Sequence, residues 1–81
     1  MIIRSTIISQ FETVAKEKGL HLPPLNDDLV LLESGLDSLS FAIVVARLED
    51  QLGYDPFSAD ADLQIPITLS DFIRIYEDHA A

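Results

Sequence analysis

The chain has 81 residues, which is enough for one small domain over residues 1–81 and too few for two hydrophobic cores. It contains no cysteine, so disulfides, thiolate zinc sites and a cysteine nucleophile are excluded, and its 48% of apolar residues indicates a folded rather than a disordered chain. The formal net charge of −9 disfavours nucleic acid and anionic lipid as ligands, because both are negatively charged, and favours proteins with basic patches.

Near the start of the chain, apolar residues recur at steps of three and four residues: Ile3, Ile7, Phe11 and Val14. This spacing predicts an amphipathic helix that ends near Gly19, shortly after two lysines. The following segment, LHLPPLNDD, contains a proline pair and an Asn-Asp-Asp cluster and is expected to be an irregular connection. We expect the leucines of this long loop to fold back onto the core; these are Leu25, Leu29, Leu31 and Leu32.

A second helix is predicted from Leu39 to Leu52, where the apolar spacing is again helical. Gly53 is expected to end it, since glycine readily adopts the left-handed conformation that often follows a helix. Pro56 then limits the next element, and residues 58–64 are expected to hold one or two helical turns.

A last helix is expected to begin after Thr68, because Asp71 stands three residues later, as in a capping box. Its apolar residues follow the spacing i, i+3, i+4 and i+7: Leu69, Phe72, Ile73 and Tyr76. No segment has the alternation of a half-buried strand. The sequence therefore predicts an all-α fold, a small four-helix bundle with three main helices, a short third helix and a long loop after the first helix.

The second predicted helix has two apolar faces when its residues are placed about 100° apart around the axis. One face is sufficient to contact the core and contains Phe41, Val44, Val45, Leu48 and Leu52. The other begins beside Ser38 and contains Leu39, Ala42, Ile43 and Ala46. A helix in a small bundle needs only one such face, so the second is either buried under the long loop or a docking surface for another protein.

Ser38 stands where the loop is predicted to become the second helix. Asp37 is a suitable N-cap, which makes Ser38 the first helical residue and leaves its hydroxyl at the helix N-terminus. Ser38 can therefore be part of a helix start, a nucleophile or an attachment site. A nucleophile is disfavoured, because His21 and His79 are in no recognisable triad arrangement and GLDSLS is not the G-x-S-x-G motif. A phosphate ester suits the position, because free N–H groups and the helix dipole favour negative charge.

No metal site is predicted. Asp60 and Asp62 begin like a calcium-binding loop, but its sixth position is Ile65 instead of glycine and its twelfth is Asp71 instead of glutamate. A solvated acidic turn is the simpler interpretation. Glycine-rich phosphate loops and basic, aromatic patches for nucleic acid are also missing from the sequence.

The amino terminus, MIIRST, has no basic segment followed by a long apolar run, so we expect no signal peptide. The longest unbroken apolar run extends from Phe41 to Ala46, whereas a membrane-spanning helix needs roughly 20 residues. We therefore expect a cytoplasmic protein without a membrane span, and the lack of cysteine is compatible with this location.

The motif GLDSL, Gly35 to Leu39, followed by the helix SFAIVVARLEDQLG, resembles the acyl carrier proteins and the related peptidyl carrier domains. The order of the predicted elements, the length and the acidity are also similar to this family. The resemblance implies a single carrier domain with no catalytic activity of its own. It further implies that a phosphopantetheinyl transferase moves 4′-phosphopantetheine from coenzyme A onto Ser38, and that this arm carries an acyl or aminoacyl group as a thioester.

The resemblance also implies partner-binding residues. Asp37 is expected to assist the transferase near its magnesium ion, and Leu39 to contact the transferase and later partners. The second apolar face becomes a docking surface made of Leu39, Ala42, Ile43 and Ala46, ringed by Glu33, Asp37, Glu49 and Asp50. The expected partners are the transferase, a loading ligase and synthase enzymes with basic docking patches. We expect the carrier to be a monomer.

Several features depart from the commonest fatty-acid carriers. Ile43 stands where they usually have a carboxylate, Ser34 replaces the leucine usual before the motif glycine, and the stretch after Pro56 is slightly longer. The run VVARLE is closer to peptidyl carriers. These departures favour a stand-alone carrier in a specialised fatty-acid, polyketide or nonribosomal-peptide pathway. The alternative is an acidic helical adaptor that keeps the carrier fold without the modification.

Overall fold

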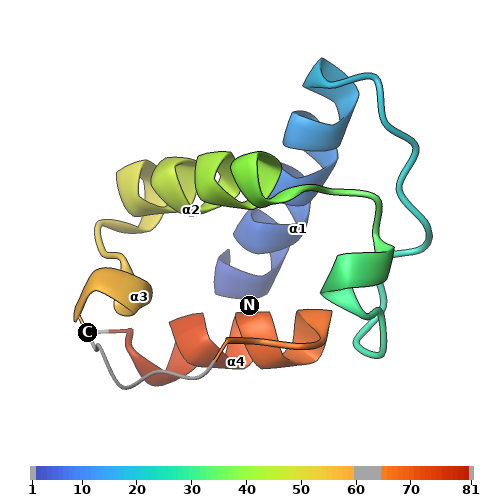
Figure 1. The fold of residues 1–81 in the computed structure, drawn as a ribbon. Helices are drawn as coiled ribbons and strands as arrows, with labels where there is room; N and C mark the ends of the chain where they lie inside the picture. The colour runs from blue at the N-terminus through green and yellow to red at the C-terminus, as the bar shows by residue number, and fades with distance from the viewer. Residues whose placement is uncertain (1, 60–64, 81) are drawn as a thin grey trace.

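The computed structural model describes residues 2–59 and 65–80, and within these residues it contains helices and no strand. The elements are α1 (Ile2–Glu17), the 3-10 helix η1 (Leu31–Glu33), α2 (Ser38–Leu52), α3 (Pro56–Ala59) and α4 (Leu69–Asp78). Helix α1 packs against both α2 and α4, and α3 lies at the end of the molecule where α2 ends (Figure 1). The predicted all-α bundle is confirmed. None of the described helices is both long enough and apolar enough to cross a membrane.

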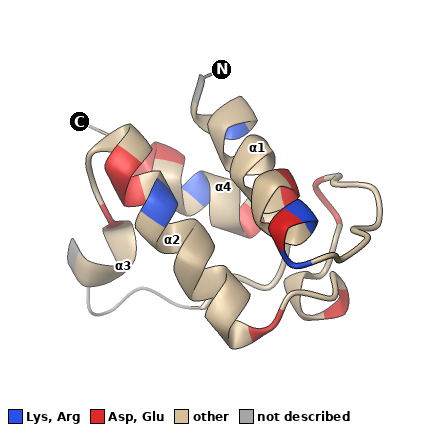
Figure 2. Ribbon diagram, turned by 90° about the horizontal axis from the view of Figure 1, so that it is seen from above, with Lys and Arg blue, Asp and Glu red and all other residues tan. Residues whose placement is uncertain are grey.

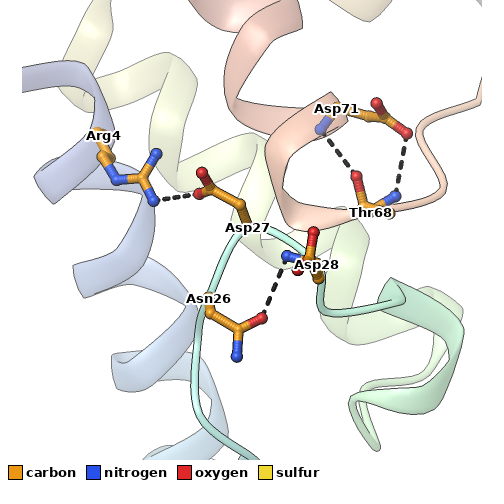
Figure 3. Close-up of polar contacts among 6 residues, drawn as sticks. All are labelled: Arg4, Asn26, Asp27, Asp28, Thr68 and Asp71. Atoms are coloured by element: carbon orange, nitrogen blue, oxygen red, sulfur yellow. Dashed lines mark hydrogen bonds and ion pairs between the residues drawn. The ribbon is translucent and has the colours of Figure 1, made fainter.

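The helix ends follow from local chemistry. Helix α1 ends shortly before Gly19, as predicted. Gly53 follows α2 with a φ of 86°, and its N–H donates to the Glu49 carbonyl at 2.8 Å. Before α4, the Thr68 hydroxyl accepts a hydrogen bond from the Asp71 N–H at 3.1 Å, and the Asp71 carboxylate accepts from the Thr68 N–H at 3.2 Å (Figure 3). The predicted capping box is therefore confirmed.

The long loop between α1 and α2 is attached to the start of α4 by an isolated antiparallel bridge. The Leu31 N–H donates to the Ile67 carbonyl, and the Leu69 N–H donates to the Leu29 carbonyl, both at 2.9 Å. We call this pair of contacts, between residues 29–31 and 67–69, the loop bridge. It satisfies backbone groups that would otherwise be left without partners at the edge of the core.

Side chains next to the loop bridge add to this attachment. Arg4 of α1 forms an ion pair with Asp27 (Figure 3). The Asp27 carbonyl also accepts a hydrogen bond from the Ser70 N–H at 3.1 Å. Within the loop, Asn26 Oδ1 accepts from the Asp28 N–H at 3.1 Å. The loop thus contacts both α1 and α4 over one short stretch.

The predicted burial of the loop leucines is correct for three of them. Leu31 is buried, and Leu25 and Leu29 are partly buried against the core. Leu32 is 89% exposed, so its predicted burial is wrong. The cause is η1, which was not predicted: once its first residue faces the core, the next residue of a tight helix points away from it.

The core lies between the three long helices. Its buried apolar residues are Ile7, Phe11, Val14, Ala15, Leu31, Leu36, Val44, Leu48, Leu69, Phe72, Ile73 and Tyr76. All five residues of the predicted core face of α2 contact it: Val44 and Leu48 are fully buried, and Phe41, Val45 and Leu52 are partly buried. The predicted phase of α2 is confirmed.

All six aromatic side chains of the chain belong to one connected cluster. Phe72 of α4 is central, with ring centroids 5.3 Å from Phe11, 5.9 Å from Phe57 and 5.2 Å from Tyr76. Phe41 of α2 joins through Phe11 at 6.0 Å. These contacts connect all four α-helices, and the tilted and edge-to-face geometries are the favoured ones for aromatic pairs.

The short third helix begins earlier than predicted. It starts at Pro56 itself, because proline has no N–H to lose at the first helical position. The Asp55 carboxylate, just before the helix, accepts hydrogen bonds from the Phe57 N–H at 2.9 Å and from the Ser58 hydroxyl at 2.9 Å. The remainder of the predicted segment, residues 60–64, lies outside the described residues.

Removing the hydroxyl group of Tyr76 and that of Tyr54 is predicted to change the stability of the fold in opposite directions. The Tyr76 hydroxyl is buried without a hydrogen-bond partner among the described groups, whereas the Tyr54 hydroxyl donates to the Tyr76 carbonyl at 2.6 Å. We expect Tyr76→Phe to raise the free energy of unfolding by about 1 kcal/mol and Tyr54→Phe to lower it by about 1 kcal/mol. Urea unfolding of both variants measures this. A loss of stability in Tyr76→Phe would show that its hydroxyl has a partner.

Candidate functional site

Ser38 is the first residue of α2, and its side chain is exposed. Asp37 is the N-cap, and its Oδ1 accepts a hydrogen bond from the Ser40 N–H at 2.8 Å. No described group hydrogen-bonds the Ser38 hydroxyl, whereas Ser40 is buried. The predicted helix start is confirmed, and it leaves a free hydroxyl at the N-terminus of α2.

The Asp37 carboxylate accepts hydrogen bonds from Ser40. Hydrogen bonds from the Ser40 backbone and hydroxyl lower the pKa of Asp37 below its ordinary value of 3.8. The carboxylate is therefore charged at neutral pH and lies at the positive end of the α2 dipole. This geometry stabilises the helix start and does not make Asp37 a base for Ser38.

The turn between η1 and α2 is held by a buried serine. The Ser34 hydroxyl donates to the Leu31 carbonyl at 2.6 Å and accepts from the Leu36 N–H at 3.3 Å. Gly35 has a φ of 92°, a left-handed conformation that strains other residues. Because Leu36 is also buried, the start of α2 has a defined place relative to η1. Sequence reasoning noted Ser34 but missed this role, although a Ser-Gly pair is a turn signal.

An apolar pocket of about 480 Å³ lies beside Ser38. Its walls are formed by residues 30–32, residues 65–67 and four helical side chains: Phe41, Val45, Phe57 and Phe72. Apart from Ser38, every residue that lines it is apolar. Sequence reasoning missed this pocket, because it depends on the loop bridge that brings residues 30–32 next to residues 65–67. The sequence feature that could have indicated the pocket is the pair Ile65 and Ile67, two large apolar residues outside any predicted helix.

The family model for the phosphopantetheine attachment site matches residues 6–74. The chain belongs to this carrier family. A non-reducing polyketide synthase, CTB1, from Cercospora beticola is 35% identical over 57 residues, which are 70% of this chain and 3% of that protein. The chain thus spans a small part of the relative's length, and no solved structure matches it.

Domains of this family carry a covalently attached 4′-phosphopantetheine group, so the predicted cofactor is confirmed. The structure of the carrier fits such a group at Ser38. The hydroxyl is exposed, no described residue competes for it, and it stands at a helix N-terminus that favours a phosphate.

The predicted docking surface is exposed at three of its four positions. Leu39 is 61% exposed, and Ala42 and Ala46 are exposed as well. Ile43 is partly buried and packs against the core, so only part of its side chain is accessible to a partner, and its role in docking stays a prediction. A charge at Ile43 would therefore disturb the carrier fold as well as any partner contact.

The acidic residues of the predicted ring are all exposed, but they lie at the two ends of α2. Glu33 and Asp37 precede Ser38, and Glu49 and Asp50 stand in the last turn. From Ser38 to Ala46 the helix has no charged residue (Figure 2). The exposed face of the carrier beside Ser38 is thus uncharged along its first half, with carboxylates beyond each end.

Arg47 is the one cation of α2, and it is paired. Its guanidinium donates to both carboxylate oxygens of Glu17 in α1, at 2.9 Å and 2.6 Å. The pKa of Glu17 is lowered by this hydrogen bonding. The pair is exposed and adds little to stability, but it orients Arg47 toward α1.

Among residues 2–59 and 65–80, no group of three His, Asp or Glu side chains is placed to hold a metal ion. Asp60 and Asp62, which began the calcium-loop comparison, lie outside the described residues.

Asp37 gives a prediction about pH. Because folding lowers its pKa, the Asp37 charge stabilises the fold above pH 3.8, and this stabilisation is lost as the pH falls through the lower folded-state pKa. Asp37→Asn keeps an oxygen acceptor for Ser40 but has no charge. We expect the wild type to be the more stable protein at neutral pH and the difference to vanish in acid. Urea unfolding at a series of pH values tests this, and a constant difference would contradict it.

Proposed function

We propose that the chain holds an acyl or aminoacyl group on a 4′-phosphopantetheine arm attached to Ser38 and passes it to partner enzymes. The observation that carries the proposal concerns the Ser38 hydroxyl. It is exposed at the start of α2 and has no hydrogen bond to a described group, and Ser38 lies inside the region that matches the family. When bound, the arm supplies a thiol that holds the carried group as a thioester. The similarity to a polyketide synthase favours a polyketide-type or related specialised pathway.

In this proposal the chain catalyses no reaction itself. Ser38 has no acid or base within hydrogen-bond reach among the described groups, and the Asp37 carboxylate is occupied by Ser40. Attachment, loading and transfer are therefore the work of partner enzymes: a phosphopantetheinyl transferase, a loading ligase and downstream synthases. The chain contributes recognition and keeps its cargo at high effective concentration near the partner.

The proposed docking surface combines an apolar centre with acidic ends. Leu39, Ala42 and Ala46 would contact the partner directly beside Ser38. Basic residues of the partner would approach Glu33 and Asp37 at one end of α2 and Glu49 and Asp50 at the other. Such charge pairs set the orientation and the rate of encounter more than the affinity.

The first test of the proposal is intact mass. The purified chain is incubated with coenzyme A, magnesium and a broad-specificity phosphopantetheinyl transferase, with Ser38→Ala as the control. We expect the wild type alone to gain one phosphopantetheine. A wild type that gains no mass with several transferases would leave Ser38 as a helix start and favour an unmodified adaptor.

A second test concerns the docking surface. Ala42→Glu places a charge in the uncharged half of α2, while Gln51→Glu adds the same charge to an exposed position at its far end. We expect Ala42→Glu to lower kcat/KM of the transferase by roughly tenfold, equivalent to about 1.4 kcal/mol, with unchanged stability. Gln51→Glu should leave kcat/KM near the wild-type value. Equal effects of the two variants would show that net charge matters and the docking surface does not.

A further inference from the structure

Ser34 connects η1 to the start of α2 through its side chain. The residue is only 4% exposed, and its hydroxyl donates to the Leu31 carbonyl at 2.6 Å and accepts from the Leu36 N–H at 3.3 Å. The Ser34 N–H donates to the same Leu31 carbonyl at 3.1 Å. One buried hydroxyl thus joins backbone groups on both sides of the turn, and the Leu36 N–H would lose its partner without it.

These contacts continue to α4. The Leu31 N–H donates to the Ile67 carbonyl at 2.9 Å, as part of the loop bridge, and the Leu31 side chain is buried. Leu36, on the other side of the turn, is buried as well. The chain is therefore held at successive points from the loop bridge to the residue before Asp37, and Ser34 is the middle point.

The first turn of α2 is restrained from two directions. Within the helix, the Asp37 carboxylate accepts from the Ser40 N–H at 2.8 Å, and the Asp37 carbonyl accepts from the Phe41 N–H at 3.0 Å. From outside the helix, Ser34 holds the residue before Asp37 to η1. Helix ends open readily where their own hydrogen bonds alone hold them. Loss of the Ser34 hydroxyl is therefore expected to loosen the first turn, which includes Ser38, and to leave the rest of α2 in place.

The attachment step needs the Ser38 hydroxyl in a defined place. Its Oγ forms a bond to the phosphorus of coenzyme A that carries the pantetheine group, and the bond from that phosphorus to the bridging oxygen breaks. Adenosine bisphosphate leaves, and the hydroxyl proton passes to a base of the transferase. Because the attacking and leaving oxygens lie in line, a small displacement of Oγ lowers the rate steeply.

We propose that Ser34 is a positioning residue for the attachment of phosphopantetheine: its hydroxyl holds the first turn of α2 where the Ser38 Oγ can attack. This inference rests on the attachment at Ser38 proposed above. Ser34 is buried and acts through the backbone of Leu36, so it need not touch coenzyme A. Most of the proposed docking surface lies beyond the first turn of α2, so the loss of Ser34 should slow the chemical step and leave docking nearly unchanged.

The test follows a single turnover by intact mass, with coenzyme A saturating and the phosphopantetheinyl transferase in excess over the purified chain. The limiting rate then reports the chemical step, and the transferase concentration at half the limiting rate reports docking. Ser34→Ala removes the hydroxyl, and Ser34→Thr keeps one. Tyr54→Phe is the matched control, because it removes a different hydrogen bond, to the Tyr76 carbonyl, beyond the other end of α2.

We expect Ser34→Ala to lower the limiting rate by roughly tenfold and to change the half-saturating concentration by less than about twofold. Ser34→Thr should recover most of the wild-type rate, and Tyr54→Phe should keep it. An unchanged rate in Ser34→Ala, or an equal fall in Ser34→Ala and Tyr54→Phe, would overturn the positioning role. A change confined to the half-saturating concentration, or no recovery in a Ser34→Thr variant as stable as the wild type, would overturn it too.

Amide hydrogen exchange gives a readout without the transferase, and it decides the matter if Ser34→Thr is itself unstable. In Ser34→Ala, the Leu36 and Phe41 N–H groups should exchange at least about fivefold faster than in the wild type, with little change in the last two turns of α2. An equal acceleration along the whole helix would show a general loss of stability and contradict a local role. A wild type that gains no phosphopantetheine would instead overturn attachment at Ser38, so the two failures are distinguishable.

Discussion

The loop bridge is the constraint on which the site depends. Two backbone hydrogen bonds join residues 29–31 to residues 67–69, two segments far apart in the sequence. From this attachment the chain continues through η1 and the Ser34 turn to the start of α2, so the place of Ser38 is set from α4 as well as from α1. The same contact brings residues 30–32 beside residues 65–67 and thereby creates the pocket. The position of Ser38 and the existence of the pocket therefore have the same cause, the loop bridge.

The sequence predicts well those features that depend on nearby residues. Helix spacing, the glycine after α2, the Thr68–Asp71 capping box and the Asp37 N-cap each involve residues within four positions of one another. Such interactions form in the same way in most folds, so a short stretch of sequence is sufficient to recognise them. The confirmed family was recognised from the local motif GLDSL together with the helix that follows it, the order of the elements, the length and the acidity.

Features that depend on distant contacts could not be predicted in this way. The exposure of Leu32 follows from η1, whose first residue, Leu31, is also part of the loop bridge. The partial burial of Ile43 depends on the side chains that surround α2, which its position on a helical wheel does not reveal. Ser34 was noticed as unusual, but its role requires the carbonyl of Leu31 and the amide of Leu36 to converge on one hydroxyl. To predict any of these three features, one must know which distant segments of the chain contact one another.

The uncharged first half of α2 has a consequence for the unfolded chain. In the helix, residues 40–46, SFAIVVA, are divided between the core and the exposed face. Before the helix forms, the same run is uncharged, free of proline and rich in β-branched residues, which is typical of segments that stack into cross-β fibrils. Asp37 before it and Glu49 and Asp50 after it bring like charges together whenever two copies stack in register. These acids are therefore expected to limit aggregation of this uncharged segment.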